Sequence, residues 1–208
     1  MIRSSPIDAK AAVLALSCAD PALGRLMRRH GPFTLEVRRG ATPFERLGQA
    51  IVRQQLSNRV ADVIAARLKV ALGGAWQPEA VREAPDDLLR GAGLSRAKAV
   101  ALKDLAAKTL DGTVPGFAAL DDMADEEIIL HLTEVKGIGE WTAQMFLIFA
   151  LGRPDVMPIQ DLGVRRGFQR VHGLAELPLP PAILDHSERW RPWRTVASWY
   201  LWRAAEAE

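Results

Sequence analysis

The stretch HLTEVKGIGEWTAQMFLIFALGRPDVMPIQDLGVRRGFQR, residues 131–170, contains the pattern that decides the fold. Apolar residues recur at helical spacing over 128–135, which predicts a helix that buries one face. Gly137 lies where a left-handed helix end is favoured, and Gly139 precedes a second apolar helix that begins near Trp141. The pattern therefore predicts two helices joined by a tight turn.

The turn itself, Lys136-Gly137-Ile138-Gly139, is suited to bind a phosphate through its main chain. Two glycines let the backbone approach closely, and the second helix offers unpaired N–H groups and the positive end of its dipole. Lys136 adds a point charge. The alternative interpretation is an ordinary helical hairpin punctuated by glycine.

KGIGEWTA at 136–143, followed by PIQDLGVRRG at 158–167, resembles the helix-hairpin-helix/Gly-Pro-Asp superfamily of DNA base-excision glycosylases. Within it the chain is most similar to 3-methyladenine DNA glycosylase type II, which removes alkylated bases. The similarity covers nearly all 208 residues. It includes DPALGRLMRRHGP at 20–32, FERLGQAIVRQQLS at 44–57 and ERWRPWRTVASWYLWR at 188–203.

The resemblance places the superfamily's catalytic acid at Asp161 and its proline at Pro158. A base alkylated on a ring nitrogen is already cationic and departs without a general acid. One ionised carboxylate then suffices to stabilise the oxocarbenium-like sugar and to position water. The structural alternative is that Asp161 caps the helix that follows it, and the two roles are compatible.

Trp141 distinguishes two chemistries. Superfamily members that also nick the strand carry a lysine at this place, and without an amine no Schiff base can form with the sugar. We therefore expect a monofunctional enzyme that leaves an abasic site. The single cysteine, Cys18, cannot supply the four thiolates of an iron-sulfur cluster, and we expect no cofactor. The four histidines form no metal-ligand pattern. The resemblance suggests a monovalent cation at the hairpin, bound by the main-chain carbonyls of Thr133, Val135 and Gly137.

The base pocket is expected to select cationic bases by stacking and cation-π attraction. The resemblance places Trp141 and Trp190 in it, together with Met145 and Leu162, where the family's better-known member has tyrosines. This departure suggests a roomier pocket with a broader substrate range. The other tryptophans of the last segment are expected to pack the final helix: Trp193, Trp199 and Trp202. The alternative is that Trp190 also belongs to the core.

A flipped base leaves a gap that an apolar wedge usually fills. Leu56, in RQQLSNR at 53–59, precedes the helix cap Ser57 and corresponds to a leucine that the resembling family inserts into DNA. An isolated leucine is more often a core residue, but this one lies at a polar helix junction. The residues expected to contact DNA are Gln54, Gln55, Leu56, Ser57, Lys136, Gly137, Ile138, Gly139, Thr142, Arg165 and Arg194.

The charge balance is nearly even, with 27 Lys and Arg against 25 Asp and Glu and a sequence pI of about 8.9. Arginines cluster at 165–170 and 189–194, which favours salt-dependent phosphate binding, although such clusters are often only solvated. No stretch reaches the roughly 20 apolar residues of a membrane span, and Asp8 and Lys10 interrupt any signal peptide. We expect a cytoplasmic, nucleoid-associated monomer that binds double-stranded DNA containing alkylated bases.

The chain as a whole is predicted to be all-α, a single glycosylase domain over 1–208 without an N-terminal β-domain. Residues 1–40 plus 155–208 would form a terminal helical subdomain, and 41–154 a middle one with the hairpin at 125–151. Leu56, Trp141 and Asp161 would line a DNA-binding cleft that the subdomains flank. FTLEVR at 33–38 alternates like a short strand. Helices are predicted at 8–17, 21–30, 43–54, 58–72, 95–110, 125–136, 140–151, 162–172 and 192–206.

Three other interpretations stay open. A glycosylase of the same fold could act on uracil, hypoxanthine, 1-methyladenine or mismatched adenine. A non-catalytic helix-hairpin-helix module would use Asp161 only as a cap. A helical protein-interaction domain would leave the Lys-Gly-Ile-Gly turn and the arginine clusters unexplained.

Overall fold

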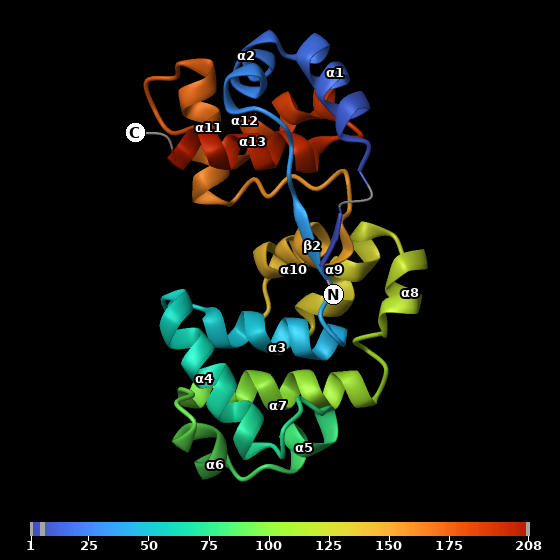
Figure 1. Ribbon diagram of the computed structural model, residues 1–208, viewed down its shortest axis with the longest axis vertical. Helices are drawn as coiled ribbons and strands as arrows, with labels where there is room; N and C mark the ends of the chain where they lie inside the picture. Colours follow the sequence, from blue (N-terminus) through green and yellow to red (C-terminus); the bar gives the residue numbers. More distant parts are fainter. Residues whose placement is uncertain (1, 5–6, 207–208) are drawn as a thin grey trace. The chain divides into compact units, whose positions relative to one another are not determined.

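The computed structural model describes residues 2–4 and 7–206. Within these residues the chain is helical apart from one antiparallel sheet, in which β1 (Ile2–Ser4) pairs with β2 (Glu36–Arg38) (Figure 1). The predicted all-α class is therefore confirmed. The strand predicted at 33–38 forms only over its last three residues.

The chain divides into two compact units. We call them the middle unit, Arg39–Phe146, and the terminal unit, Ile2–Arg38 with Leu147–Glu208. The sequence placed the second boundary after residue 154, whereas in the structure it follows Phe146. The reason is that the next residues form the π-helix η1 (Leu147–Leu151), which packs against β2 within the terminal unit.

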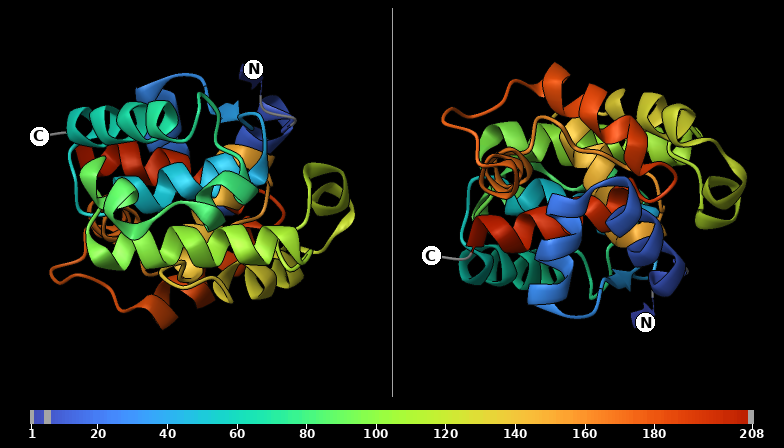
Figure 2. Two further views of the ribbon diagram at one scale, coloured as in Figure 1. Left: turned by 90° about the horizontal axis from the view of Figure 1, so that it is seen from below. Right: turned by 90° about the horizontal axis from the view of Figure 1, so that it is seen from above.

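The middle unit is built around α7 (Arg96–Leu110), which packs against α3 (Pro43–Arg53) and α5 (Pro78–Glu83) (Figures 1 and 2). Leu102 and Leu105 of α7 are fully buried in its core. The other helices of the unit are α4 (Asn58–Ala71), α6 (Asp86–Gly91), α8 (Phe117–Asp122), α9 (Asp125–Thr133) and α10 (Glu140–Phe146).

The terminal unit is centred on α11 (Leu162–His172) and α13 (Arg194–Glu206), which pack directly on each other. Their backbones approach so closely at Gly167 that a Cβ there would lie 1.9 Å from the carbonyl oxygen of Leu201. Only glycine fits this contact. The remaining helices are α1 (Ala9–Ala19), α2 (Pro21–His30), α12 (Pro180–Ser187) and the 3-10 helix η2 (Glu188–Trp190).

The longer helices agree with the sequence prediction to within a few residues, but four short ones were missed. They are α5, α6 and α8, of six residues each, and α12, of eight. None has a side-chain cap hydrogen bond at its N-terminus. A helix of only about two turns repeats its apolar pattern too few times for periodicity to reveal it.

Candidate functional site

Asp161 lies at the N-cap of α11 in the terminal unit. Its backbone N–H donates to the carbonyl of Pro158 at 2.9 Å, which closes the turn before the helix. Its Oδ1 accepts a hydrogen bond from the backbone N–H of Val164 at 2.9 Å. The capping role considered from the sequence is therefore present, and it fixes the carboxylate relative to the helix start.

A second donor reaches the same oxygen from the last helix. Nε1 of Trp202 donates to Oδ1 of Asp161 at 2.8 Å, and the indole stacks on Phe149 with ring centroids 5.7 Å apart. A Cβ at position 163 would lie 2.8 Å from Cδ1 of Trp202 and 3.1 Å from Oδ1 of Asp161. Gly163 therefore gives the indole room to reach the carboxylate.

Sequence reasoning missed this role of Trp202, which it assigned to packing of the final helix. The structure shows both roles, because the indole packs on Phe149 and its N–H also donates to Asp161. The available signal was the pair Gly163 and Gly167, one helical turn apart on α11. Two glycines on one face of a helix indicate that another element approaches it closely.

The hairpin lies in the middle unit, between α9 and α10. Gly137 adopts φ +80°, a left-handed conformation that favours glycine, while the neighbouring Ile138 points into the core. The Lys136 side chain is 70% exposed, and its backbone N–H donates to Oδ2 of Asp104 at 2.8 Å. Trp141, in the first turn of α10, is 47% exposed. The turn thus presents glycine backbone, a lysine and an indole at its surface.

The Leu56 loop, residues 54–57, joins α3 to α4 in the same unit. Leu56 is 37% exposed, so it is not a core leucine. Gln55 has φ +58°, and Ser57 caps α4 by accepting from the backbone N–H of Val60. The side chain of Gln54 donates to the carbonyl of Gly137 at 2.8 Å, so this loop is hydrogen bonded to the hairpin.

Residues 49–192 match a protein family described as "HhH-GPD superfamily base excision DNA repair protein". The chain belongs to the HhH-GPD superfamily. A relative, DNA-3-methyladenine glycosylase 1 of Schizosaccharomyces pombe, is 39% identical over 166 residues, 79% of this chain and 73% of that protein.

Two solved structures are similar over almost the whole chain. One is the 3-methyladenine DNA glycosylase Mag1 of Schizosaccharomyces pombe in complex with abasic DNA, with a TM-score of 0.80 and 37% identity, covering 93% of this chain and 95% of that one. The other is the DNA-3-methyladenine glycosidase of Bacillus halodurans, with a TM-score of 0.87 and 32% identity, covering 100% and 93%. These matches confirm the resemblance inferred from the sequence.

Trp190, expected in the base pocket of this HhH-GPD protein, is instead a core residue with 0% exposure. Its Nε1 donates to Oδ2 of Asp20 at 3.2 Å, and Nε2 of His186 lies 2.9 Å from the same oxygen. Because a carboxylate only accepts, the imidazole must donate. Oδ1 of Asp20 accepts from two backbone N–H groups at the start of α2. The alternative interpretation of Trp190 as core is therefore correct.

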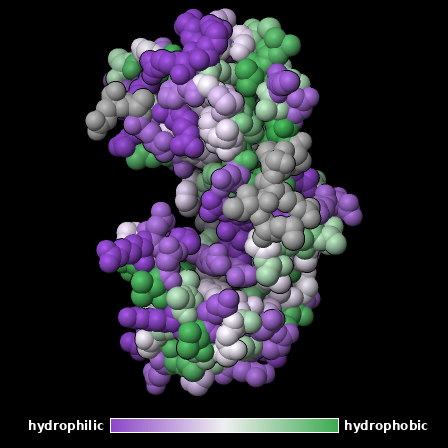
Figure 3. All heavy atoms as spheres, in the orientation of Figure 1, coloured by the Kyte–Doolittle hydropathy of each residue, from purple (hydrophilic) through white to green (hydrophobic). Residues whose placement is uncertain are grey.

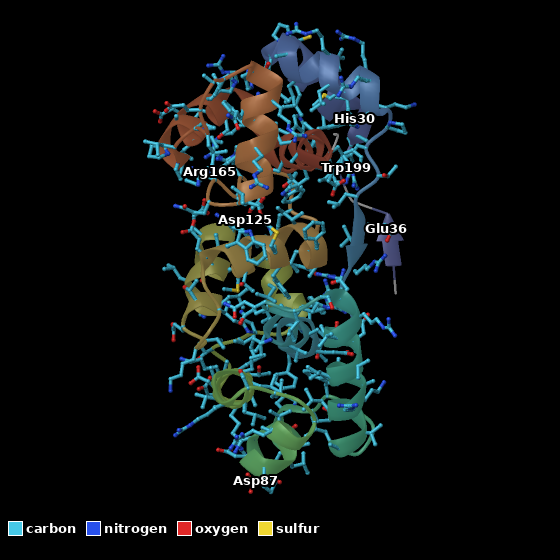
Figure 4. The ribbon with its side chains drawn as sticks, turned by 90° about the vertical axis from the view of Figure 1, so that its left-hand side faces the viewer. His30, Glu36, Asp87, Asp125, Arg165 and Trp199 are labelled. Carbon is cyan, nitrogen blue, oxygen red and sulfur yellow. The ribbon has the colours of Figure 1, made fainter. Side chains whose placement is uncertain are left out.

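Arg194, expected to bind DNA, is also structural. Its side chain is 9% exposed and its Nε donates to Oδ1 of Asp155 at 2.8 Å. Other arginines of the two clusters are partly engaged as well: Arg165 donates to the carbonyl of Pro178, and Arg170 to that of Ala204. Figure 4 labels Arg165 among the side chains of the terminal unit. Some N–H donors of these arginines are therefore already used in contacts within the protein.

The remaining predicted residues divide by exposure. Thr142 is buried, so its side chain does not face DNA as predicted. The side chain of Met145 is half-buried, and Leu162, the residue after Asp161, is 47% exposed. Figure 3 shows mainly hydrophilic side chains on the face that it draws of each unit. Of the helices in the described part of the chain, none is long and apolar enough to cross a membrane.

Two of the three hairpin carbonyls that were predicted to bind a cation accept hydrogen bonds within the protein. The carbonyl of Val135 accepts from the backbone N–H of Ile138 at 3.0 Å, and that of Gly137 accepts from Gln54. Each carbonyl oxygen has two lone pairs, so one hydrogen bond leaves it able to coordinate.

Proposed function

We propose that this chain is a monofunctional DNA glycosylase that hydrolyses the N-glycosidic bond of alkylated purines of the 3-methyladenine type in duplex DNA. The observation that carries the proposal is the carboxylate of Asp161, held on one oxygen by the Val164 N–H and the Trp202 indole. Relatives named as DNA-3-methyladenine glycosylases support the substrate class.

The chemistry follows from the charge of the substrate. As the bond between C1′ and the alkylated base breaks, its electron pair goes to the cationic base, which leaves neutral. Positive charge develops on the sugar, and an oriented carboxylate stabilises it without reorganising. Water then adds to C1′ and loses a proton, which leaves an abasic site. Asp161 is the catalytic residue in this scheme.

Base selection is assigned to the pocket side chains. An exposed indole at Trp141 favours an electron-poor, cationic base through stacking and cation-π attraction. Since position 141 is not a lysine, no Schiff base with the sugar forms and the strand stays intact. The family resemblance also assigns Met145 and Leu162 to base selection, and neither residue carries a hydroxyl group.

DNA binding is assigned to the hairpin and to the Leu56 loop of the middle unit. Lys136 and the turn N–H groups would bind a backbone phosphate, with a cation at the carbonyls of Thr133, Val135 and Gly137 adding positive charge beside it. Leu56 would fill the gap left by the flipped base. We infer a monomer, and a cytoplasmic, nucleoid-associated location because the proposed substrate is DNA.

The test is incubation of purified protein with methylated duplex DNA, with chromatography of the released bases and a gel of the strand. We expect free 3-methyladenine and a strand that breaks only after alkali treatment. Strand breaks without alkali contradict the monofunctional assignment, and absence of any released base contradicts the proposal as a whole.

A second substrate range is favoured by one observation, the apolar residues at 145 and 162. Where the family's better-known member has tyrosine hydroxyl groups, this chain has none, so a poorly matched base would leave fewer buried polar groups without a partner. Excision of 1-methyladenine, 7-methylguanine, hypoxanthine and uracil in the same assay measures this breadth.

A further inference from the structure

We propose that Lys98 is a positioning residue for base extrusion, which acts by fixing the Leu56 loop at the end of α3. The proposal rests on the proposed function, because it assumes that Leu56 is the wedge. It concerns contacts within the middle unit only.

Lys98 lies in the first turn of α7, which packs along α3 (Figures 1 and 2). Its Nζ donates to the carbonyl of Val52 at 2.8 Å and to the carbonyl of Gln54 at 2.6 Å. The last carbonyls of a helix have no intrahelical donor, and they form the negative end of its dipole. An ammonium group satisfies both requirements, since it carries a charge and three N–H donors.

The two carbonyls bracket the point where α3 ends and the Leu56 loop begins. The next residue, Gln55, has φ +58°, a left-handed conformation that residues other than glycine rarely adopt. The backbone N–H of Leu56 then donates to the carbonyl of Arg53 at 3.1 Å. Such a conformation persists only when its surroundings hold it, and Lys98 supplies two of the bonds that do so.

A further anchor holds the other side of the loop. The side-chain amide of Gln54 donates to the carbonyl of Gly137 in the hairpin at 2.8 Å. The loop is therefore bonded to α7 through Lys98 and to the phosphate-binding turn through Gln54. This fixes the distance between the wedge and the turn before DNA binds, and pre-organisation removes an ordering cost from binding.

The neighbouring lysines do not share this geometry. Lys103, on the same helix, pairs with the exposed Asp86, and Lys136 is paired with Asp104. Burial lowers the pKa of Lys98 from its ordinary value of 10.5, which agrees with an ammonium turned toward protein carbonyls rather than toward solvent. Lys98 therefore differs from a lysine that only attracts DNA phosphates.

The test compares single-turnover excision by wild type and Lys98→Met on two duplexes. In one the alkylated base is paired, and in the other it is extruded in a bulge, where no wedge is needed. We expect a loss of roughly ten-fold or more on the paired duplex, since hydrogen bonds from a charged donor are lost. On the bulged duplex we expect less than about a two-fold change. Equal losses on both duplexes overturn the proposal, as does an unchanged rate on the paired one.

A double-mutant cycle separates this role from general destabilisation. If Lys98 acts through the wedge, the Lys98→Met substitution should have little further effect in a Leu56→Ala background, whereas additive effects contradict it. Lys98→Arg should restore part of the paired-duplex rate. Lys103→Met, from the same helix, is the matched control and should leave the paired-to-bulged ratio unchanged.

Should Lys98→Met fail to fold in a thermal melt, Gln54→Met tests the same loop from its other anchor. It should reduce the paired-duplex rate selectively, and an unchanged rate would overturn the proposal. Wild type that releases no base contradicts the proposed function instead. In that case the affinity for abasic duplex tests the role of Lys98. We expect Lys98→Met and Gln54→Met to bind abasic duplex roughly ten-fold more weakly than wild type, and binding equal to that of wild type would contradict the role.

Discussion

The indole N–H of Trp202 donates to Oδ1 of Asp161 at 2.8 Å, so a residue of the last helix orients the carboxylate at the start of α11. The contact depends on Gly163, whose missing Cβ leaves room for the indole. Asp161, Gly163 and Trp202 thus together fix the position of one carboxylate in the terminal unit.

Trp202→Phe should lower the excision rate by roughly ten-fold while leaving the affinity for abasic duplex unchanged. Phenylalanine can still stack on Phe149, but it cannot donate to Asp161. Single-turnover rates and binding titrations measure the two quantities separately. Trp193→Phe is the control, because Trp193 is half-buried in the same segment. An unchanged rate for Trp202→Phe would show that the indole does not orient the acid.

The two glycines of α11 should respond differently to substitution. At Gly163 the added methyl group meets a side chain, 2.8 Å from Cδ1 of Trp202, so Gly163→Ala should impair excision more than stability. At Gly167 it meets the backbone of Leu201, which cannot move without separating α11 from α13. Gly167→Ala should therefore lower the free energy of unfolding by about 3 kcal/mol or more. Thermal and urea unfolding measure the stability of the two variants. Equal stability of Gly163→Ala and Gly167→Ala would contradict the different roles of the two glycines.

How far the sequence predicted this site depends on the kind of contact. Asp161, Trp141 and the glycine turn each lie in a short motif formed with their sequence neighbours. The sequence alone was therefore enough to single them out. Trp190 and Trp202 could not be told apart, because they lie in one tryptophan-rich run and only tertiary packing decides which one meets Asp161 and which one meets Asp20.

The same limit explains Arg194 and Gln54. A charged or polar side chain in a DNA-binding motif has the same sequence signature whether it faces phosphate or a protein partner. Arg194 pairs with Asp155, and Gln54 bonds to the carbonyl of Gly137, both distant in the chain. Helices with strong periodicity and caps, such as α3 and α7, were predicted to within a residue at each end.

Stability should fall in mild acid because of His172. Its pKa is lowered, chiefly by burial, below the ordinary 6.5, so the unfolded chain binds the proton more tightly. Above pH 6.5 neutral His172 makes its full contribution to the free energy of unfolding. This contribution is lost as the pH falls toward the pKa that His172 has in the folded protein. Urea unfolding at stepped pH should show this loss in wild type and less of it in His172→Gln. Identical slopes in the two proteins would contradict the assignment.

Asp20 should extend the acid sensitivity to lower pH. Burial alone would raise the pKa of this carboxyl, but the hydrogen bonds from His186 and the Leu23 N–H bring it below its usual 3.8. A lowered carboxyl pKa stabilises the fold above pH 3.8, and this stabilisation is lost as the pH falls through the folded value. Asp20→Asn should flatten this part of the stability profile, and a profile like that of wild type would argue against it.

Lys136 should contribute to DNA affinity through charge alone. Its side chain is 70% exposed, so Lys136→Ala should leave the fold intact. The affinity for duplex DNA should fall, and the slope of log affinity against log salt should decrease by about 0.9, as for one lost phosphate contact. Titrations at several salt concentrations measure the slope. Lys103→Ala is the control. If the slope for Lys136→Ala equals that of wild type, Lys136 does not contact a DNA phosphate.

The most direct measurement of the central claim is the single-turnover excision rate of Asp161→Asn on methylated duplex DNA. Asparagine is as good a helix N-cap as aspartate and can accept from Val164 and Trp202 through its amide oxygen, so the fold should be retained. Only the negative charge is lost. We predict a rate lower by at least about 10²–10³-fold with nearly unchanged affinity for abasic duplex. An asparagine variant that releases 3-methyladenine at the wild-type rate would contradict the assignment of Asp161 as the catalytic residue.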